Sequence, residues 1–152
     1  MMRLVVAATH RGRRNLLCQK LSEHLPHALL VPVSSPEALE EAIRSDTPRS
    51  VILSADLCTM ALSPDSLTDT IRQCNPDIHI VWVLPRQANA PLWLDRAQAY
   101  DFDILVQPVN GLVLAQRCLC AQNDAYRLQL ANKRLAMLAQ RRSESLYESD
   151  ER

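Results

Sequence analysis

Asp103-Ile104-Leu105-Val106-Gln107-Pro108-Val109 is the stretch that decides the fold. It is a short apolar run that ends at a proline, and apolar residues at helical spacing begin directly after it, at Gly111. A strand buried in a parallel sheet has this form, a short continuous apolar run bounded by a turn signal. We therefore predict that a strand at 104–106 ends at the edge of a sheet and is followed at once by a helix.

Four earlier apolar runs have the same form, and each is followed by a helical pattern. They predict strands at 4–8, 28–33, 51–53 and 78–84, with helices at 11–25, 36–46, 64–74 and 92–100. Two of the helices begin with a serine cap, a proline and an acid, at Ser35-Pro36-Glu37 and Ser63-Pro64-Asp65. Thr9 is the expected cap of the first helix, and Pro32 favours an edge position for the second strand. Five alternations of strand and helix predict a doubly wound α/β sheet.

The composition argues against several classes of site. With 152 residues, of which 47% are hydrophobic, the chain suits one domain plus an appendage. Its 17 basic and 17 acidic residues cancel, so no nucleic-acid or membrane surface is expected over the whole chain. Only two glycines occur, and neither a dinucleotide-binding nor a P-loop motif is present. We expect no cofactor.

The five cysteines and the lengths of the apolar runs indicate the compartment. Five is an odd number, and the cysteines contain no C-x-x-C pair and no histidine at finger spacing. This favours buried thiols in a reducing environment over disulfides or a zinc site. No run reaches the ~18 apolar residues of a membrane span. The sequence therefore predicts a cytoplasmic protein that does not contact the membrane.

The layout of these segments resembles the receiver domain of two-component response regulators over residues 3–121. Pro76-Asp77-Ile78 through Pro85 aligns with the fourth-strand segment of that family, and Leu105-Val106-Gln107-Pro108-Val109 aligns with the fifth. The resemblance implies a flavodoxin-like (CheY-like) sheet of five parallel strands in the order 2-1-3-4-5, with an extended C-terminal helix. It also implies a site at the carboxyl ends of the strands.

The chain departs from this family at nearly every chemical position. Receiver domains have an acidic pair after the first strand, a phosphate-accepting aspartate at the third, a hydroxyl residue at the fourth and Lys-Pro at the fifth. The aligned residues here are Ala7, Ala8, Ser54, Leu84, Gln107 and Pro108, so the proline alone is kept. Magnesium needs carboxylate ligands, and acyl-phosphate formation needs a carboxylate nucleophile with charge compensation. We therefore predict no catalytic residue and no metal site.

Asp56 is the remaining acid near this edge, and two interpretations of it stay open. It lies two residues beyond Ser54 and would point to the same side if the strand continued. Asp56-Leu57 also resembles the Asp-Leu that often carries the phosphate in receiver domains. The alternative is an aspartate in the loop after the third strand. His10 follows the first strand, and we interpret it as a loop histidine because no partner can be named for it.

Helical spacing continues from Gly111 to about Tyr147, roughly 35 residues, or about three times the mean helix length. Residues 1–121 would form the receiver-like domain, 122–147 a helical extension and 148–152 a tail or linker. Heptad spacing in the extension predicts a seam of four residues, Leu128, Ala131, Leu135 and Leu138. We expect this seam to form a parallel homodimer; the alternative is a solvated helix held by its own i,i+4 pairs.

The final residues, Leu146 and Glu148-Ser149-Asp150-Glu151-Arg152, resemble the lead-in of PAS sensor domains. An output domain of PAS, kinase or cyclase type, or a partner signalling protein, is therefore the expected target. We predict a non-catalytic, phosphorylation-independent receiver-like module that dimerises and relays conformation through its C-terminal helix. Two alternatives remain open: the receiver part of an RNA-binding antiterminator, and a weakly phosphorylated response regulator that uses Asp56. No nucleic-acid partner is expected for this part of the chain.

Overall fold

The computed structural model describes residues 2–122 and 132–142 of the chain. Strands and helices alternate along it as the apolar runs predict. The elements are β1 (Arg3–Ala7), α1 (Arg11–His24), β2 (Leu29–Val33), α2 (Pro36–Asp46), β3 (Ser50–Ser54), the short 3-10 helix η1 (Ala55–Leu57), α3 (Pro64–Cys74), β4 (His79–Leu84), α4 (Ala90–Tyr100), β5 (Asp103–Val106) and α5 (Gly111–Gln122). A further helix covers 132–142.

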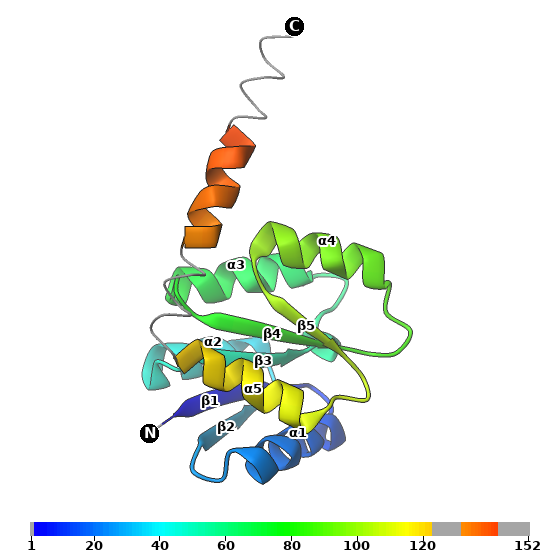
Figure 1. Ribbon diagram of the computed structural model, residues 1–152. Helices are drawn as coiled ribbons and strands as arrows, with labels where there is room; N and C mark the ends of the chain where they lie inside the picture. Colours follow the sequence, from blue (N-terminus) through cyan, green and yellow to red (C-terminus); the bar gives the residue numbers. More distant parts are fainter. Residues whose placement is uncertain (1, 123–131, 143–152) are drawn as a thin grey trace, which may run out of the picture.

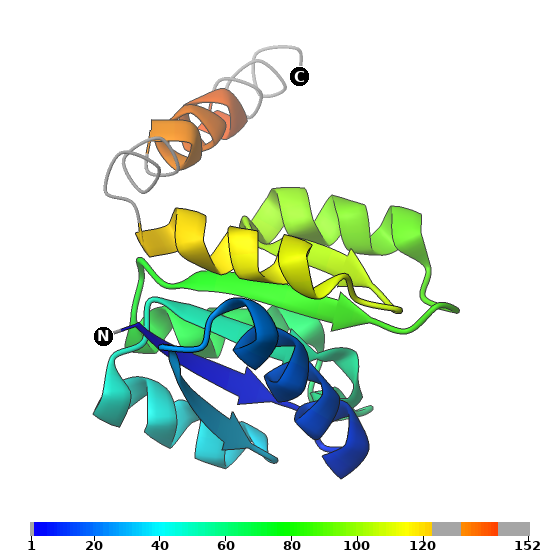
Figure 2. The same cartoon turned by 60° about the horizontal axis from the view of Figure 1, so that its bottom comes forward.

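The five strands form one parallel sheet in the order β2-β1-β3-β4-β5, which confirms the predicted fold class and strand order. Helices cover both faces, with α1 and α5 on one and α2, α3 and α4 on the other (Figures 1 and 2). β2 is an edge strand, as Pro32 predicted, because a proline there removes no hydrogen bond from a central ladder. The central strands β3 and β4 are buried along their whole length, which explains their unbroken apolar sequences.

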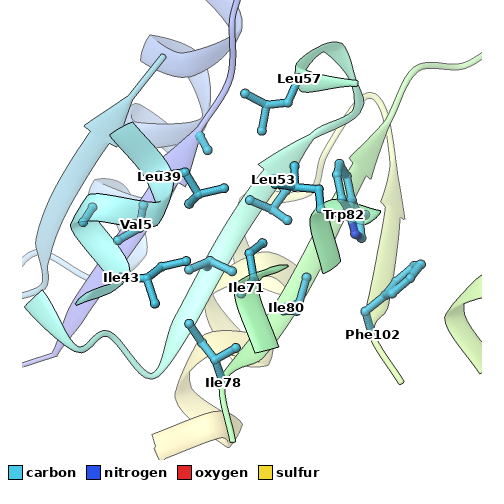
Figure 3. Close-up of a cluster of buried hydrophobic side chains, with 14 of the residues drawn as sticks. Val5, Leu39, Ile43, Leu53, Leu57, Ile71, Ile78, Ile80, Trp82 and Phe102 are labelled. Atoms are coloured by element: carbon cyan, nitrogen blue, oxygen red, sulfur yellow. The ribbon is translucent and has the colours of Figure 1, made fainter. Parts of the chain in front are cut away.

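Two apolar cores lie on opposite faces of the sheet. The larger core packs α2, α3 and α4 against the sheet, and Trp82 is its largest fully buried side chain (Figure 3). The ring centroids of Trp82 and Trp93 are 5.6 Å apart, and the Trp82 indole N–H donates a hydrogen bond to Thr68 Oγ1 at 3.2 Å. Both tryptophans therefore pack in the core, since the polar atom of Trp82 has a buried partner.

The helix starts agree with the capping signals in two cases and differ in one. Ser35 and Ser63 cap α2 and α3, and each side chain accepts a backbone N–H of the first turn. The cap of α1 is His10 rather than Thr9, because His10 Nδ1 accepts the N–H of Arg13 at 3.3 Å. The backbone N–H of Thr9 is instead directed to Asp56, which sequence spacing could not reveal.

The predicted long C-terminal helix is present as two described stretches, α5 and the helix at 132–142. The second stretch points in a different direction from α5 and lies beside the end of α4 (orange in Figures 1 and 2). Its Arg134 forms an ion pair with Asp101, and Arg141 donates to the carbonyl of Ala99 at 2.9 Å. The described residues therefore form two helices with different directions, not one straight helix from Gly111 to residue 142.

Two of the four residues of the predicted seam lie within the described residues. Leu135 and Leu138 are 65% and 51% exposed, while Leu128 and Ala131 lie outside the described residues. The tail at 148–152 is outside them as well. All five cysteines are free, but Cys118 alone among them is buried: Cys18, Cys58 and Cys74 are half-buried and Cys120 is exposed. Among the described helices, none combines the length and the apolar character that a membrane crossing requires.

Candidate functional site

The carboxyl edge of the sheet collects the residues that align with receiver chemistry. Ala7 and Ala8 at the end of β1 and Leu84 at the end of β4 are fully buried, and Ser54 at the end of β3 is nearly so. Pro108 is exposed after a cis peptide bond, and Gln107 is half-buried. None of these six side chains can bind a cation as a carboxylate or neutralise a phosphoryl group as a cation.

Asp56 does lie at this edge, but on η1 rather than on a continued strand. Its two carboxylate oxygens accept separate backbone N–H groups across the edge. Oδ1 accepts from Thr9 and Oδ2 from His10, each at 3.0 Å. The side chain is 15% exposed, and its Oδ2 is 3.7 Å from the guanidinium of Arg13. The carboxylate thus holds the start of α1 against the loop after β3, through charge-assisted hydrogen bonds.

Local structure explains why Asp56 turns toward α1. Ser54 Oγ caps η1 and accepts the backbone N–H of Asp56, which ends the strand and starts the turn. The turn aims the carboxylate at Thr9 and His10, where β1 has ended and the backbone N–H groups are unpaired by the sheet. The strand does not continue to Asp56, which lies in the turn directly after β3, and its carboxylate is held there by two backbone N–H groups. His10 is likewise tied to a carboxylate through its main chain.

Asp56 belongs to no metal-binding cluster within the described part of the chain. In residues 2–122 and 132–142, no group of three or more His, Cys, Asp or Glu side chains is arranged to hold a metal ion. A site for Mg²⁺ would need several oxygen ligands at near-octahedral geometry. Asp56 supplies one carboxylate, and its oxygens are already accepting hydrogen bonds.

A polar network that the sequence did not predict lies at the opposite, amino edge of the sheet. It joins the first residues of three strands: Ser50 Oγ is 3.1 Å from His79 Nδ1, and His79 Nε2 is 2.7 Å from Asp103 Oδ2. Arg117 of α5 donates to the other oxygen of Asp103 at 3.1 Å. Although serine, histidine and aspartate are aligned, Ser50 is fully buried, so a substrate cannot reach its hydroxyl. The network ties α5 to the sheet.

The pKa of Asp103 reflects this arrangement. Burial raises the pKa of its carboxyl, but the hydrogen bond and charge of His79 and the charge of Arg117 outweigh burial and lower it. The sequence signals for the network were weak: Ser50 and Asp103 each precede an apolar run, while His79 lies within one. The register that pairs Ser50 with His79 is a property of the folded sheet.

Comparison with known proteins gives evidence on the fold alone. No protein-family model matches the sequence, and a search of curated proteins also found no match. Among solved structures, a response regulator receiver domain protein from Clostridium thermocellum superposes with a TM-score of 0.66 at 14% identity. The match covers 90% of this chain and 99% of that one. The receiver domain of NtrC4 from Aquifex aeolicus gives 0.65 at 13% identity, covering 80% and 96%.

A third match is to a much longer protein. NtrX from Brucella abortus has a TM-score of 0.65 at 19% identity, over 91% of this chain but 30% of that chain. The present chain thus spans less than a third of NtrX. At such low identities the comparisons establish the architecture: this chain has the flavodoxin-like fold of response regulator receiver domains.

Proposed function

We propose that the chain is a non-catalytic signalling module of a two-component-type regulator, a receiver-like domain that works without phosphorylation. The observation that carries the proposal is the state of Asp56. Asp56, the acid that the described residues place at the carboxyl edge after β3, has both oxygens engaged by the backbone of Thr9 and His10.

The surroundings of Asp56 also lack the groups that phosphoryl transfer would need. The positions after β1 are alanines, so no second carboxylate helps to bind a divalent cation. Gln107 is neutral where a lysine would compensate the charge of the phosphoryl group. A phosphorylated Asp56 would also lose hydrogen bonds that now hold α1 in place, which makes the modified state costly.

In this proposal a conformational change in the receiver-like domain is passed on through the C-terminal helix. The contacts of Arg134 and Arg141 with the end of α4 give the helix at 132–142 a defined attachment to the domain. Arg72 of α3 holds the C-terminal end of α4 in place by donating hydrogen bonds to the carbonyls of Tyr100 and Asp101, each at 2.6 Å. A change in the domain could then shift this helix, and with it an output domain or a partner signalling protein.

Phosphorylation can be tested by intact-protein mass spectrometry after incubation with acetyl phosphate and Mg²⁺. The expected result is an unchanged mass, because the described residues form no cation site at this sheet edge and the carboxylate of Asp56 is already engaged. A receiver domain with its acidic pair intact, treated in parallel, shows that the reagent is active. A stoichiometric gain of one phosphoryl group that disappears in Asp56→Asn would overturn the proposal.

Dimerisation can be tested by light scattering on the full chain. We expect a dimer mass for the wild type and a monomer for Leu135→Glu/Leu138→Glu, because charges in a coiled-coil seam are strongly unfavourable. Leu119→Glu is the matched control, since Leu119 is an exposed leucine of α5 outside the seam. It should remain dimeric. A monomeric wild type at high concentration would show that the seam does not form.

A further inference from the structure

A cavity of about 500 Å³ opens at the carboxyl edge, on the face covered by α1 and α5. It lies between α1, as far as Lys20, and the loops that follow β4 and β5. Small-molecule sites in proteins have volumes of roughly 300–1,000 Å³, so this cavity is of ordinary size for a metabolite. It does not include Asp56, and the proposed function makes no use of it.

The walls of the cavity combine positive charge with apolar surface. Four basic side chains line it, His10, Arg13, Lys20 and Arg86, and no acidic residue is among its lining residues. Leu16 and Pro108 are part of its apolar wall, and Leu16 is half exposed. In a chain whose formal net charge is zero, a cavity whose ionisable lining residues are all basic has a local excess of positive charge. Its chemistry suits an anion attached to a flat apolar group.

The basic groups come from separate segments, and other contacts position Lys20 and His10. Lys20 donates to the carbonyl of Val109, which holds its ammonium at the mouth between α1 and the loop after β5. Arg86 is exposed on the loop after β4. His10 Nδ1 accepts the N–H of Arg13, so the neutral ring carries its proton on Nε2 and can donate from that atom. Arg13 is only loosely paired with Asp56, at 3.7 Å.

Both glycines of the chain lie in or beside this region, Gly12 in the cavity wall and Gly111 against Lys20 of α1. A Cβ at Gly12 would be 3.0 Å from His10 Cε1, a tight contact that the imidazole could relieve only by shifting slightly. A Cβ at Gly111 would be 3.2 Å from the backbone oxygen of Lys20, so this glycine allows α5 to approach α1 closely. Two glycines in 152 residues, both at this junction, are explained by close approach rather than by backbone conformation, since neither has a positive φ.

We propose that this cavity binds a phosphorylated small molecule of about mononucleotide size. The phosphate would be held by Arg86, Lys20 and the Nε2–H of His10, and the flat part of the ligand would lie against Leu16 and Pro108. Such a ligand would provide an input signal that needs no phosphoryl transfer. The inference is independent of the proposed function, because binding and covalent modification are measured separately.

The ligand class is tested by isothermal titration of the full chain with AMP and GMP, with adenosine and inorganic phosphate as separate arms. We expect at least one mononucleotide to bind at least tenfold more tightly than either adenosine or phosphate, because only the nucleotides satisfy both the basic and the apolar wall. No binding of AMP or GMP at millimolar concentration would overturn the inference. Equal binding of adenosine would also overturn it, as would equal binding of phosphate.

Substitutions of cavity residues test whether the nucleotide binds in this cavity. Arg86→Ala removes an exposed base and should weaken nucleotide binding by about tenfold without unfolding the protein, given the strength of hydrogen bonds to charged groups. Gly12→Ala should also weaken binding by displacing His10, although alanine is the better helix former. The matched control is Arg44→Ala, an exposed arginine of α2 paired with Glu40. Wild-type affinity in both cavity variants, or an equal loss in Arg44→Ala, would contradict the assignment.

Discussion

Replacing Asp56 with alanine is expected to lower the free energy of unfolding by about 2 kcal/mol, since the carboxylate makes two charge-assisted hydrogen bonds. The cost is limited because Thr9 and His10 are exposed, so water can hydrate their N–H groups in the variant. The measurement is urea denaturation followed by tryptophan fluorescence, which reports unfolding because Trp82 and Trp93 are buried.

Two further variants separate the role of Asp56 from a general loss of charge. Asp56→Asn keeps one oxygen acceptor and should lose less stability than Asp56→Ala. Asp95→Ala removes an exposed acid of α4 and should change stability by no more than about 0.5 kcal/mol. If Asp56→Ala were as stable as the wild type, the carboxylate would not be structural, and it would be available for chemistry.

The second large effect is expected at the amino edge of the sheet. Asp103→Asn keeps the shape of the side chain but removes the charge that faces His79 and Arg117. Hydrogen bonds to charged groups contribute about 1.5–3 kcal/mol, and because Asp103 is a quarter exposed, we expect a loss at the lower end of that range. The same urea denaturation measures it.

The loss in Asp103→Asn should also depend on pH. The pKa of Asp103 is lowered in the folded protein by His79 and Arg117, against the effect of burial. The folded state therefore holds the ionised form, and its stabilisation is present above the unfolded pKa of about 4. It disappears as the pH falls through the lower, folded pKa.

Wild type and Asp103→Asn should thus differ most near neutral pH and converge in acid. Asp95→Asn, a variant of an exposed acid on α4, provides the comparison for nonspecific charge effects. A difference between wild type and Asp103→Asn that stayed constant from pH 7 to well below pH 4 would show that ionised Asp103 does not stabilise the fold.

The sequence was sufficient for the fold because the signals were local. A strand buried on both faces has no polar alternation, so β3 and β4 were visible as apolar runs. Ser35-Pro36 and Ser63-Pro64 marked helix starts through side chains that bond to the next turn. The change of direction before the helix at 132–142 had no such local signal, because the helical spacing is the same on both sides of it.

The site was less predictable because its contacts join distant parts of the chain. Asp56 could be named as a residue of interest, but its partners Thr9 and His10 are 47 and 46 residues away. Turning it toward them required η1, a single short turn that leaves no periodic pattern. His79 was hidden within an apolar run, and its pairing with Asp103 depends on the register of β4 and β5. Spacing alone contains neither fact.

The most direct test of the central claim is a titration of the isotope-labelled chain with beryllofluoride and Mg²⁺, followed through the backbone amide resonances of Thr9, His10 and Asp56. Beryllofluoride occupies the place of a phosphoryl group on a reactive carboxylate. We predict no saturable change at these amides, because the carboxylate of Asp56 keeps its two N–H partners and residues 2–122 and 132–142 form no cation site there. Saturable shifts of the Thr9 and His10 amides that require Mg²⁺ and vanish in Asp56→Asn would contradict it.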